Sequence, residues 1–110
     1  MKQFWLADRE EQCFIYGLCD PRSQEIRYVG MTTDPVRRMR EHCTRRKYTK
    51  GRVSNWISSL RHIDLVPRML ILETVSTLEW KETERWWIAF GKRQNWPLTN
   101  LEDGGLGDHT

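Results

Sequence analysis

The chain has no long apolar segment and few of the residues that mark disordered, collagenous or disulfide-rich proteins. Its 110 residues include seven Gly, four Pro and three Cys, while 38% are hydrophobic and 30% are charged. No apolar run approaches the ~20 residues of a membrane span, and the first residues lack the apolar core and cleavage site of a signal peptide. Cys13, Cys19 and Cys43 are too few and too unevenly spaced for a disulfide framework or a zinc site. We therefore expect one domain over residues 1–110, cytoplasmic, with reduced thiols and no membrane association.

Positive charge is concentrated in one segment. Residues 37–52 hold eight Lys or Arg against one Glu, a local charge of +7 in a chain whose net charge is +3. Charge of one sign at this density repels itself unless an anion offsets it, and a phosphate backbone is the usual anion. The alternative is a solvated helix face that merely aids solubility. The candidate DNA contacts in this segment are Arg37, Arg40, Arg45, Arg46, Lys47, Lys50 and Arg52.

Three β-prone runs and three helical patterns alternate along the chain. The expected strands are residues 13–19, 25–30 and 68–75, and a turn-rich stretch joins the first two as a hairpin. The expected helices are residues 35–47, 53–61 and 77–92. Thr33 or Asp34 would cap the first, and Ser76 with Glu79 has the spacing of a capping box for the last. This order predicts an α+β domain with a small, mainly antiparallel three-stranded sheet flanked by helices.

Apolar spacing assigns a buried face to each helix. In the first helix this face collects Val36, Met39 and Cys43, while Arg38, His42 and Arg45 form a separate polar stripe. In the second it collects Val53, Trp56, Ile57 and Leu60. In the last it collects Trp80, Trp87, Ile88 and Gly91.

Glu84 lies on the apolar stripe of the last helix, four residues after Trp80 and four before Ile88. A buried carboxylate is costly unless it is paired or bound to a cation. The spacing alone therefore leaves two roles open for Glu84, an arginine-paired structural carboxylate or a metal ligand.

Several of these residues occur in an order that is similar to a known family. Phe14-Ile15-Tyr16, Tyr28-Val29-Gly30, Arg38, His42, Glu84 before Trp87-Ile88, and Asn100 together resemble the GIY-YIG nucleases, over residues 13–107. The tyrosines are twelve residues apart, Arg38 follows Gly30 by eight, and His42 follows Arg38 by four. Phe14 replaces the first glycine of the motif. Met31 stands where a Lys or Gln often follows the second motif, so Arg27, Arg37 or Arg40 would have to supply that phosphate contact.

The resemblance implies a metal-dependent endonuclease that hydrolyses DNA phosphodiester bonds, with Tyr16, Tyr28, Arg38, His42, Glu84 and Asn100 in the site. Glu84 would bind the metal, and one carboxylate suits a single Mg²⁺ or Mn²⁺. Arg38 would contact the phosphate, and Asn100 would position one of the other groups. We expect the tyrosines, Arg38 and Glu84 to meet on one face of the sheet.

Two questions stay open at this stage. Tyr16 is expected to act as the general base, or else as a positioning hydroxyl, because an ordinary phenol is about one part in a thousand ionised at neutral pH. A catalytically idle nucleic-acid-binding module of the same fold is the alternative function, and a partner-binding protein whose tryptophans cover an interface is another. The protein would recognise its target by the structure or a short sequence of the DNA, or it would act as a homodimer or with a separate targeting partner.

Overall fold

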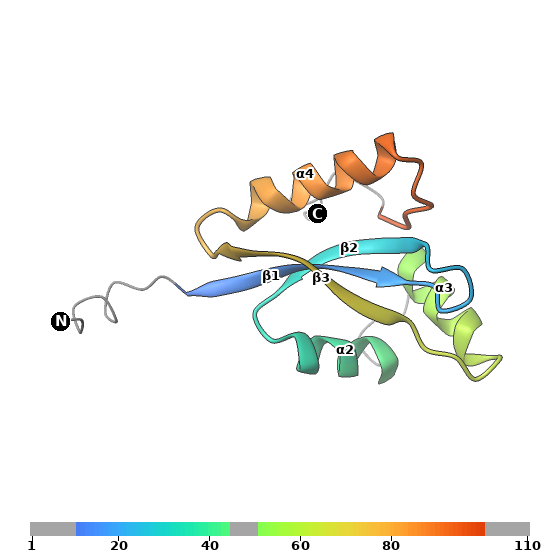
Figure 1. Cartoon of the computed structure of the whole chain (residues 1–110). Coiled ribbons are helices and arrows are strands. Elements are labelled where there is room, and N and C mark those ends of the chain that lie inside the picture. The colour runs from blue at the N-terminus through green and yellow to red at the C-terminus, as the bar shows by residue number, and fades with distance from the viewer. Residues whose placement is uncertain (1–10, 45–50, 101–110) are drawn as a thin grey trace.

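The protein is a three-stranded antiparallel sheet with helices on both faces (Figure 1). The computed structural model describes residues 11–44 and 51–100. In chain order the elements are β1 (Gln12–Cys19), β2 (Ile26–Thr32), α2 (Pro35–Thr44), α3 (Arg52–Arg61), β3 (Arg68–Ser76) and α4 (Trp80–Arg93). The predicted α+β fold is confirmed, and each strand end lies within two residues of its prediction. Lys47, the predicted end of the first helix, lies outside the described residues.

β1 is the central strand, and it pairs with β2 on one side and β3 on the other. Tyr16 in β1 lies opposite Gly30 in β2 and opposite Ile71 in β3. Side chains alternate between the two faces of a strand, so neighbouring residues of β1 contribute to different layers. Within the described ranges, no helix is both long and apolar enough to cross a membrane.

Each face of the sheet has its own apolar cluster. On one face Cys13, Ile15 and Val29 pack with Ile88 of α4. On the other face Tyr16 packs in a cluster that includes three residues of α3, namely Trp56, Ile57 and Leu60. Figure 1 shows the same division, with α4 on one side of the sheet and α2 and α3 on the other. The sheet therefore separates α4 from α2.

Helix α2 begins as predicted but turns an unexpected face to the sheet. The Asp34 carboxylate accepts a hydrogen bond of 3.1 Å from the Arg37 backbone N–H, which is the geometry of an N-cap. The predicted buried face is wrong for Val36, which is 68% exposed, whereas Met39 packs against the cluster that contains Tyr16, and the fully buried residue of α2 is His42. At this point the sheet presents the Tyr16 hydroxyl, a hydrogen-bond partner for a polar side chain. Helix α2 therefore buries His42 of the polar stripe as well as packing Met39 of the apolar stripe against the sheet.

Helix α4 begins at Trp80, three residues later than predicted. The Ser76 hydroxyl accepts a hydrogen bond of 2.9 Å from the Leu78 backbone N–H, and Glu79 is the N-cap without a capping side-chain bond. The predicted capping box is therefore wrong. Because Ser76 is the last residue of β3, its hydroxyl stabilises the turn that leaves the strand.

The buried stripes of the other two helices follow the predictions. In α3 the buried residues include Trp56, Ile57 and Leu60. In α4 Glu84 is buried together with Ile88 and Gly91. The carboxylate of Glu84 thus lies on an apolar helix face, as its spacing predicted.

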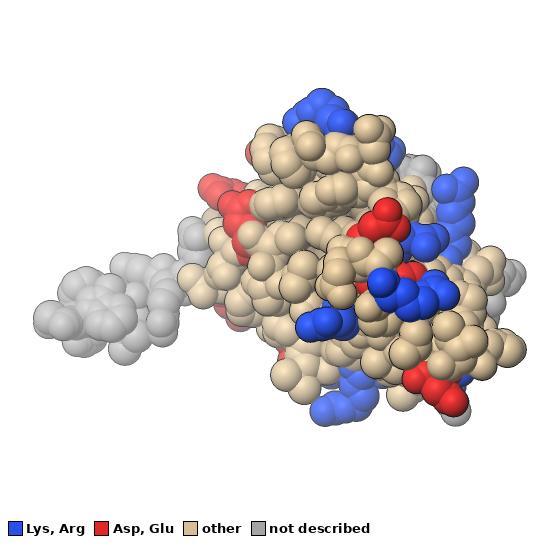
Figure 2. Space-filling view, turned by 45° about the vertical axis from the view of Figure 1, so that its right-hand side comes forward, with Lys and Arg blue, Asp and Glu red and all other residues tan. Residues whose placement is uncertain are grey.

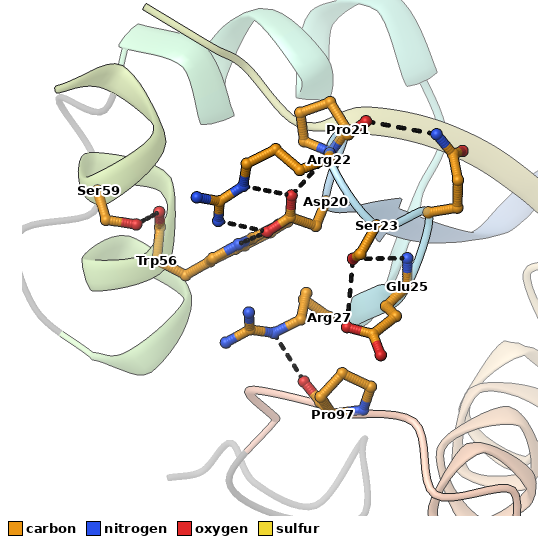
Figure 3. Close-up of polar contacts among 10 residues, drawn as sticks. Asp20, Pro21, Arg22, Ser23, Glu25, Arg27, Trp56, Ser59 and Pro97 are labelled. Atoms are coloured by element: carbon orange, nitrogen blue, oxygen red, sulfur yellow. Dashed lines mark hydrogen bonds and ion pairs between the residues drawn. The ribbon is translucent and has the colours of Figure 1, made fainter. Parts of the chain in front are cut away.

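A buried carboxylate joins the turn between β1 and β2 to α3 (Figure 3). Asp20 is 3% exposed and accepts hydrogen bonds from the guanidinium and backbone N–H of Arg22 and from the Trp56 indole N–H. Chiefly the Arg22 guanidinium, and then the other donors, hold the pKa of Asp20 well below its usual range. Arg27 lies 5.3 Å from the centre of the Trp56 ring and donates through Nε to the Pro97 carbonyl at 2.8 Å. The hairpin, α3 and the segment after α4 are therefore linked at one place.

Asp20→Asn should lower the free energy of unfolding at pH 7 by about 1–3 kcal/mol, because buried donors lose a charged acceptor. The folded-state pKa of Asp20 is lowered, so its stabilisation is present above the unfolded value of about 3.9 and is lost as the pH falls below it. Denaturant unfolding of wild type and variant at pH 7 and pH 3 should show the difference shrinking in acid. Asp64→Asn removes an exposed carboxylate in the turn after α3 and serves as the control. Equal effects of the two substitutions would contradict the role given to Asp20.

Candidate active site

Three aromatic side chains from different elements form a compact cluster. Tyr16 of β1, Tyr28 of β2 and His42 of α2 have ring centroids 5.8–6.1 Å apart. The Tyr16 hydroxyl and His42 Nε2 are 2.8 Å apart and hydrogen-bonded. Tyr16 and His42 are each 1% exposed. The structure thus brings together three of the predicted site residues around a buried hydrogen bond.

The glycine of the second motif makes room for the two tyrosine rings. A Cβ atom at Gly30 would lie 2.8 Å from the Tyr16 hydroxyl oxygen and 2.8 Å from a ring carbon of Tyr28. Both distances are shorter than van der Waals contact, so any larger residue would displace one of the rings. The sequence motif Tyr28-Val29-Gly30 therefore has a steric reason.

His42 is held in its neutral form. Burial first, and then the positive charge of Arg38, lower the pKa of His42 to about 4, and the carboxylate of Glu41 opposes this only in part. A neutral imidazole has one N–H donor and one acceptor nitrogen. Nε2 either accepts the proton of the Tyr16 hydroxyl or donates to its oxygen, and in both tautomers a proton can be exchanged at that oxygen.

Arg38 lies in an open pocket one helical turn before His42. The pocket has a volume of about 150 Å³ and is lined by Met31, Thr32, Thr33, Arg37, Arg38 and Glu41. The Arg38 side chain is 33% exposed, and its Nη1 lies 3.1 Å from a carboxylate oxygen of Glu41. A permanent positive charge is thus accessible from solvent beside the buried tyrosine–histidine pair.

Asn100 contacts the backbone of the second motif. Its side-chain carbonyl accepts from the Val29 N–H at 3.0 Å, and its amide group donates to the Val29 carbonyl at 2.9 Å. Thr99 binds the Arg27 carbonyl through its backbone N–H and its hydroxyl, at 2.6 and 2.7 Å. β2 is an edge strand, so these residues satisfy backbone groups that no neighbouring strand reaches. Asn100 therefore fixes the strand segment that carries Tyr28 and Gly30.

Glu84 does not share a sheet face with the tyrosines. It is 8% exposed and belongs to α4, which covers the face opposite Tyr16. The expectation of a site on one sheet face is therefore wrong for Glu84. The two layers adjoin at the edge of β2, because Met31 packs against the cluster beneath α4 and also lines the Arg38 pocket.

Three of the predicted DNA contacts, Arg37, Arg40 and Arg52, are described and exposed, while Arg45, Arg46, Lys47 and Lys50 lie outside the described residues. Arg27, the other candidate for a phosphate contact, is engaged by Pro97 and Trp56. On the face shown in Figure 2, basic and acidic side chains are interspersed and do not form one continuous basic patch.

Sequence reasoning missed Glu41. Its carboxylate pairs with Arg38 and, at 3.9 Å, with Arg37. The i, i+3 and i, i+4 spacings from the two arginines to Glu41 were the available signal.

The depressed pKa of His42 predicts a stability change in mild acid. The folded-state value of about 4 lies below the ordinary 6.5, so the unfolded chain binds more protons as the pH falls below 6.5. Between pH 6.5 and 4 the wild type should therefore lose stability, by at most about 1.4 kcal/mol per pH unit. His42→Gln should remove this slope, and His62→Gln, at an exposed histidine, should retain it. Denaturant unfolding at pH 7, 6 and 5 measures the three slopes, and equal slopes would contradict a buried neutral imidazole.

Comparison with known proteins agrees with the motif order. The family model for the GIY-YIG catalytic domain matches residues 12–92. No curated protein and no solved structure matches the chain. The matched range begins with the first residue of β1 and ends one residue before the end of α4, and it includes every element of the sheet. Because this range covers most of the 110 residues, the chain belongs to the GIY-YIG family.

Proposed function

We propose that this protein is an endonuclease that hydrolyses DNA phosphodiester bonds with the help of one divalent cation, Mg²⁺ or Mn²⁺. Membership in a family of nucleases supports the reaction class. The observation that carries the proposal is the 2.8 Å hydrogen bond between the Tyr16 hydroxyl and His42 Nε2, one helical turn from Arg38. This arrangement places a hydroxyl group that can exchange a proton close to a guanidinium group that can bind a phosphate.

Tyr16 is the general base in this proposal. Hydrolysis requires removal of a proton from the attacking water, and the Tyr16 oxygen accepts it. If His42 Nε2 is the acceptor, the phenol proton passes to Nε2 as the water proton arrives. If Nε2 carries the proton, its hydrogen bond stabilises the phenolate. His42 is neutral near pH 7, so both routes are compatible with its protonation state.

Arg38 binds and polarises the scissile phosphate. Its guanidinium is permanently charged, forms forked hydrogen bonds to phosphate oxygens and faces an open pocket. Positive charge at this position stabilises the extra negative charge of the transition state. The exposed Arg37, Arg40 and Arg52 would contact flanking phosphates of the duplex, and these contacts would fall in number and strength as salt rises.

Glu84 is the residue that would hold the cation. No set of three or more His, Cys, Asp or Glu side chains within residues 11–44 and 51–100 is placed to hold a metal ion. A single buried carboxylate nevertheless fits Mg²⁺, which keeps several water ligands and is often held by one or two carboxylates together with substrate phosphate oxygens. When bound, the cation supplies positive charge at the scissile phosphate.

Glu84→Gln should abolish nicking of supercoiled plasmid, because it removes the carboxylate that would hold the cation. Folding should be retained, because Gln has nearly the same shape as Glu and can still form hydrogen bonds at this buried position. The assay compares Mg²⁺, Mn²⁺ and a chelator. Glu82→Gln removes an exposed carboxylate from the same helix and should nick like the wild type.

Two outcomes of this assay would overturn parts of the proposal. Nicking by Glu84→Gln at the wild-type rate would exclude Glu84 as the metal ligand. Salt-sensitive DNA binding by the wild type, with no nicking under any of the metals, would favour the idle nucleic-acid-binding module instead.

Tyr16→Phe should lower turnover by about 10²–10⁴, the usual contribution of general acid–base catalysis. The lost hydrogen bond to His42 should cost only about 0.5–1.5 kcal/mol of stability. Tyr28→Phe removes the other hydroxyl from the same cluster and should have a smaller effect on turnover. Turnover of the wild type should rise with pH, and Tyr16→Phe should lack this rise. Cleavage by Tyr16→Phe within about threefold of wild type would leave Tyr16 only a positioning role.

A further inference from the structure

The Arg38 pocket contains a carboxylate whose role the nuclease chemistry does not account for. Glu41 lies one residue before His42 and lines the pocket together with Arg37 and Arg38. Its Oε1 is 3.1 Å from Arg38 Nη1, and its Oε2 is 3.9 Å from Arg37 Nε. Each carboxylate oxygen therefore faces one guanidinium, at the place where an anionic substrate would be expected to bind.

We propose that Glu41 competes with phosphate for Arg38, so that the pocket binds a phosphate within a DNA strand in preference to free inorganic phosphate. This inference rests on the proposed function and concerns the selectivity of the same site. Glu41 contacts Arg38 through Oε1 at Nη1, so a phosphate that binds the guanidinium in a forked geometry through Nη1 would displace this oxygen.

The competition is weak enough for a polymer to overcome. The side chains of Arg38 and Glu41 are 33% and 27% exposed, and ion pairs with this access to water have small coupling energies. A DNA strand brings several phosphates at once, and the exposed Arg37, Arg40 and Arg52 can bind the others. An isolated phosphate ion lacks these additional contacts. Its interaction with Arg38 alone must therefore offset the free energy needed to displace Glu41.

The pocket itself has room for the exchange. Its volume of about 150 Å³ admits several water molecules, and its lining also offers the exposed Thr33. Glu41 can therefore leave Arg38 without a change in the helix backbone, since its side chain need only rotate toward Arg37 or the solvent.

Binding of inorganic phosphate, without metal and without DNA, tests the proposal independently of cleavage. The probe is the NMR signal of the Arg38 Nε–H during titration with phosphate in the presence of a chelator. Glu41→Gln should bind phosphate about two- to fivefold more tightly than the wild type, the range of a partly exposed ion pair. Glu25→Gln makes the same change in net charge at an exposed site in the β1–β2 turn and should bind like the wild type.

The same substitution in an Arg38→Gln variant distinguishes competition at Arg38 from a general effect of the lost negative charge. In Arg38→Gln, followed through the His42 ring signals, the further substitution Glu41→Gln should leave phosphate affinity unchanged. An equal gain in both backgrounds, or an equal gain for Glu25→Gln, would overturn the proposal. If Glu41→Gln folds poorly, Glu41→Asp serves as a milder variant. It should retain the competition, and its phosphate affinity should lie within twofold of the wild-type value.

Cleavage assays add a readout that distinguishes this inference from the proposed function. If the protein cuts DNA, Glu41→Gln should lower KM, leave kcat unchanged and make cleavage more sensitive to inhibition by inorganic phosphate. A lowered kcat with unchanged KM would mean that Glu41 positions Arg38 for reaction and would overturn the competitor role. If the protein does not cut DNA, the phosphate titration still decides whether Glu41 competes at Arg38.

Discussion

The hydrogen bond between Tyr16 and His42 is the interaction on which the arrangement of the candidate site depends. It joins the central strand β1 to helix α2 and explains why His42, a polar residue of α2, is buried against the sheet. The two groups can meet only because Gly30 leaves space for the Tyr16 ring. Gly30 in turn lies on an edge strand whose backbone Asn100 holds at Val29. Loss of any of these contacts would alter the geometry at the Tyr16 hydroxyl.

The groups around this hydrogen bond are neutral where they are buried and charged where they reach the surface. Inside, burial and the nearby Arg38 keep His42 neutral near pH 7. At the surface, Arg38 and Arg37 supply positive charge, and Glu41 offsets part of it. A buried cation would have carried a large desolvation cost, whereas a cation at the pocket mouth does not. His42 and Arg38, with their different proposed roles, thus lie one helical turn apart on α2.

The edge of β2 is where the two layers of the protein meet. The sheet divides the molecule into a layer with α2 and α3 and a layer with α4, and Glu84 belongs to the second. Met31 contacts the α4 layer and also lines the Arg38 pocket on the other side. The proposed roles of Arg38 and Glu84 require that the DNA contact both layers at this edge.

The sequence by itself determined the strands, the buried face of α4 and the identity of the family, because these depend on local periodicity and on motif spacing. Glu84 was recognised as buried from its four-residue steps to Trp80 and Ile88. The sequence did not determine which residue of α2 is most deeply buried, since the apolar spacing included the exposed Val36 and left out His42. Only the tertiary structure decided this, because the hydroxyl of Tyr16, 26 residues away in the chain, made burial of His42 favourable. The layer that holds Glu84 was likewise decided by the path of the chain across the sheet, which no local pattern encodes.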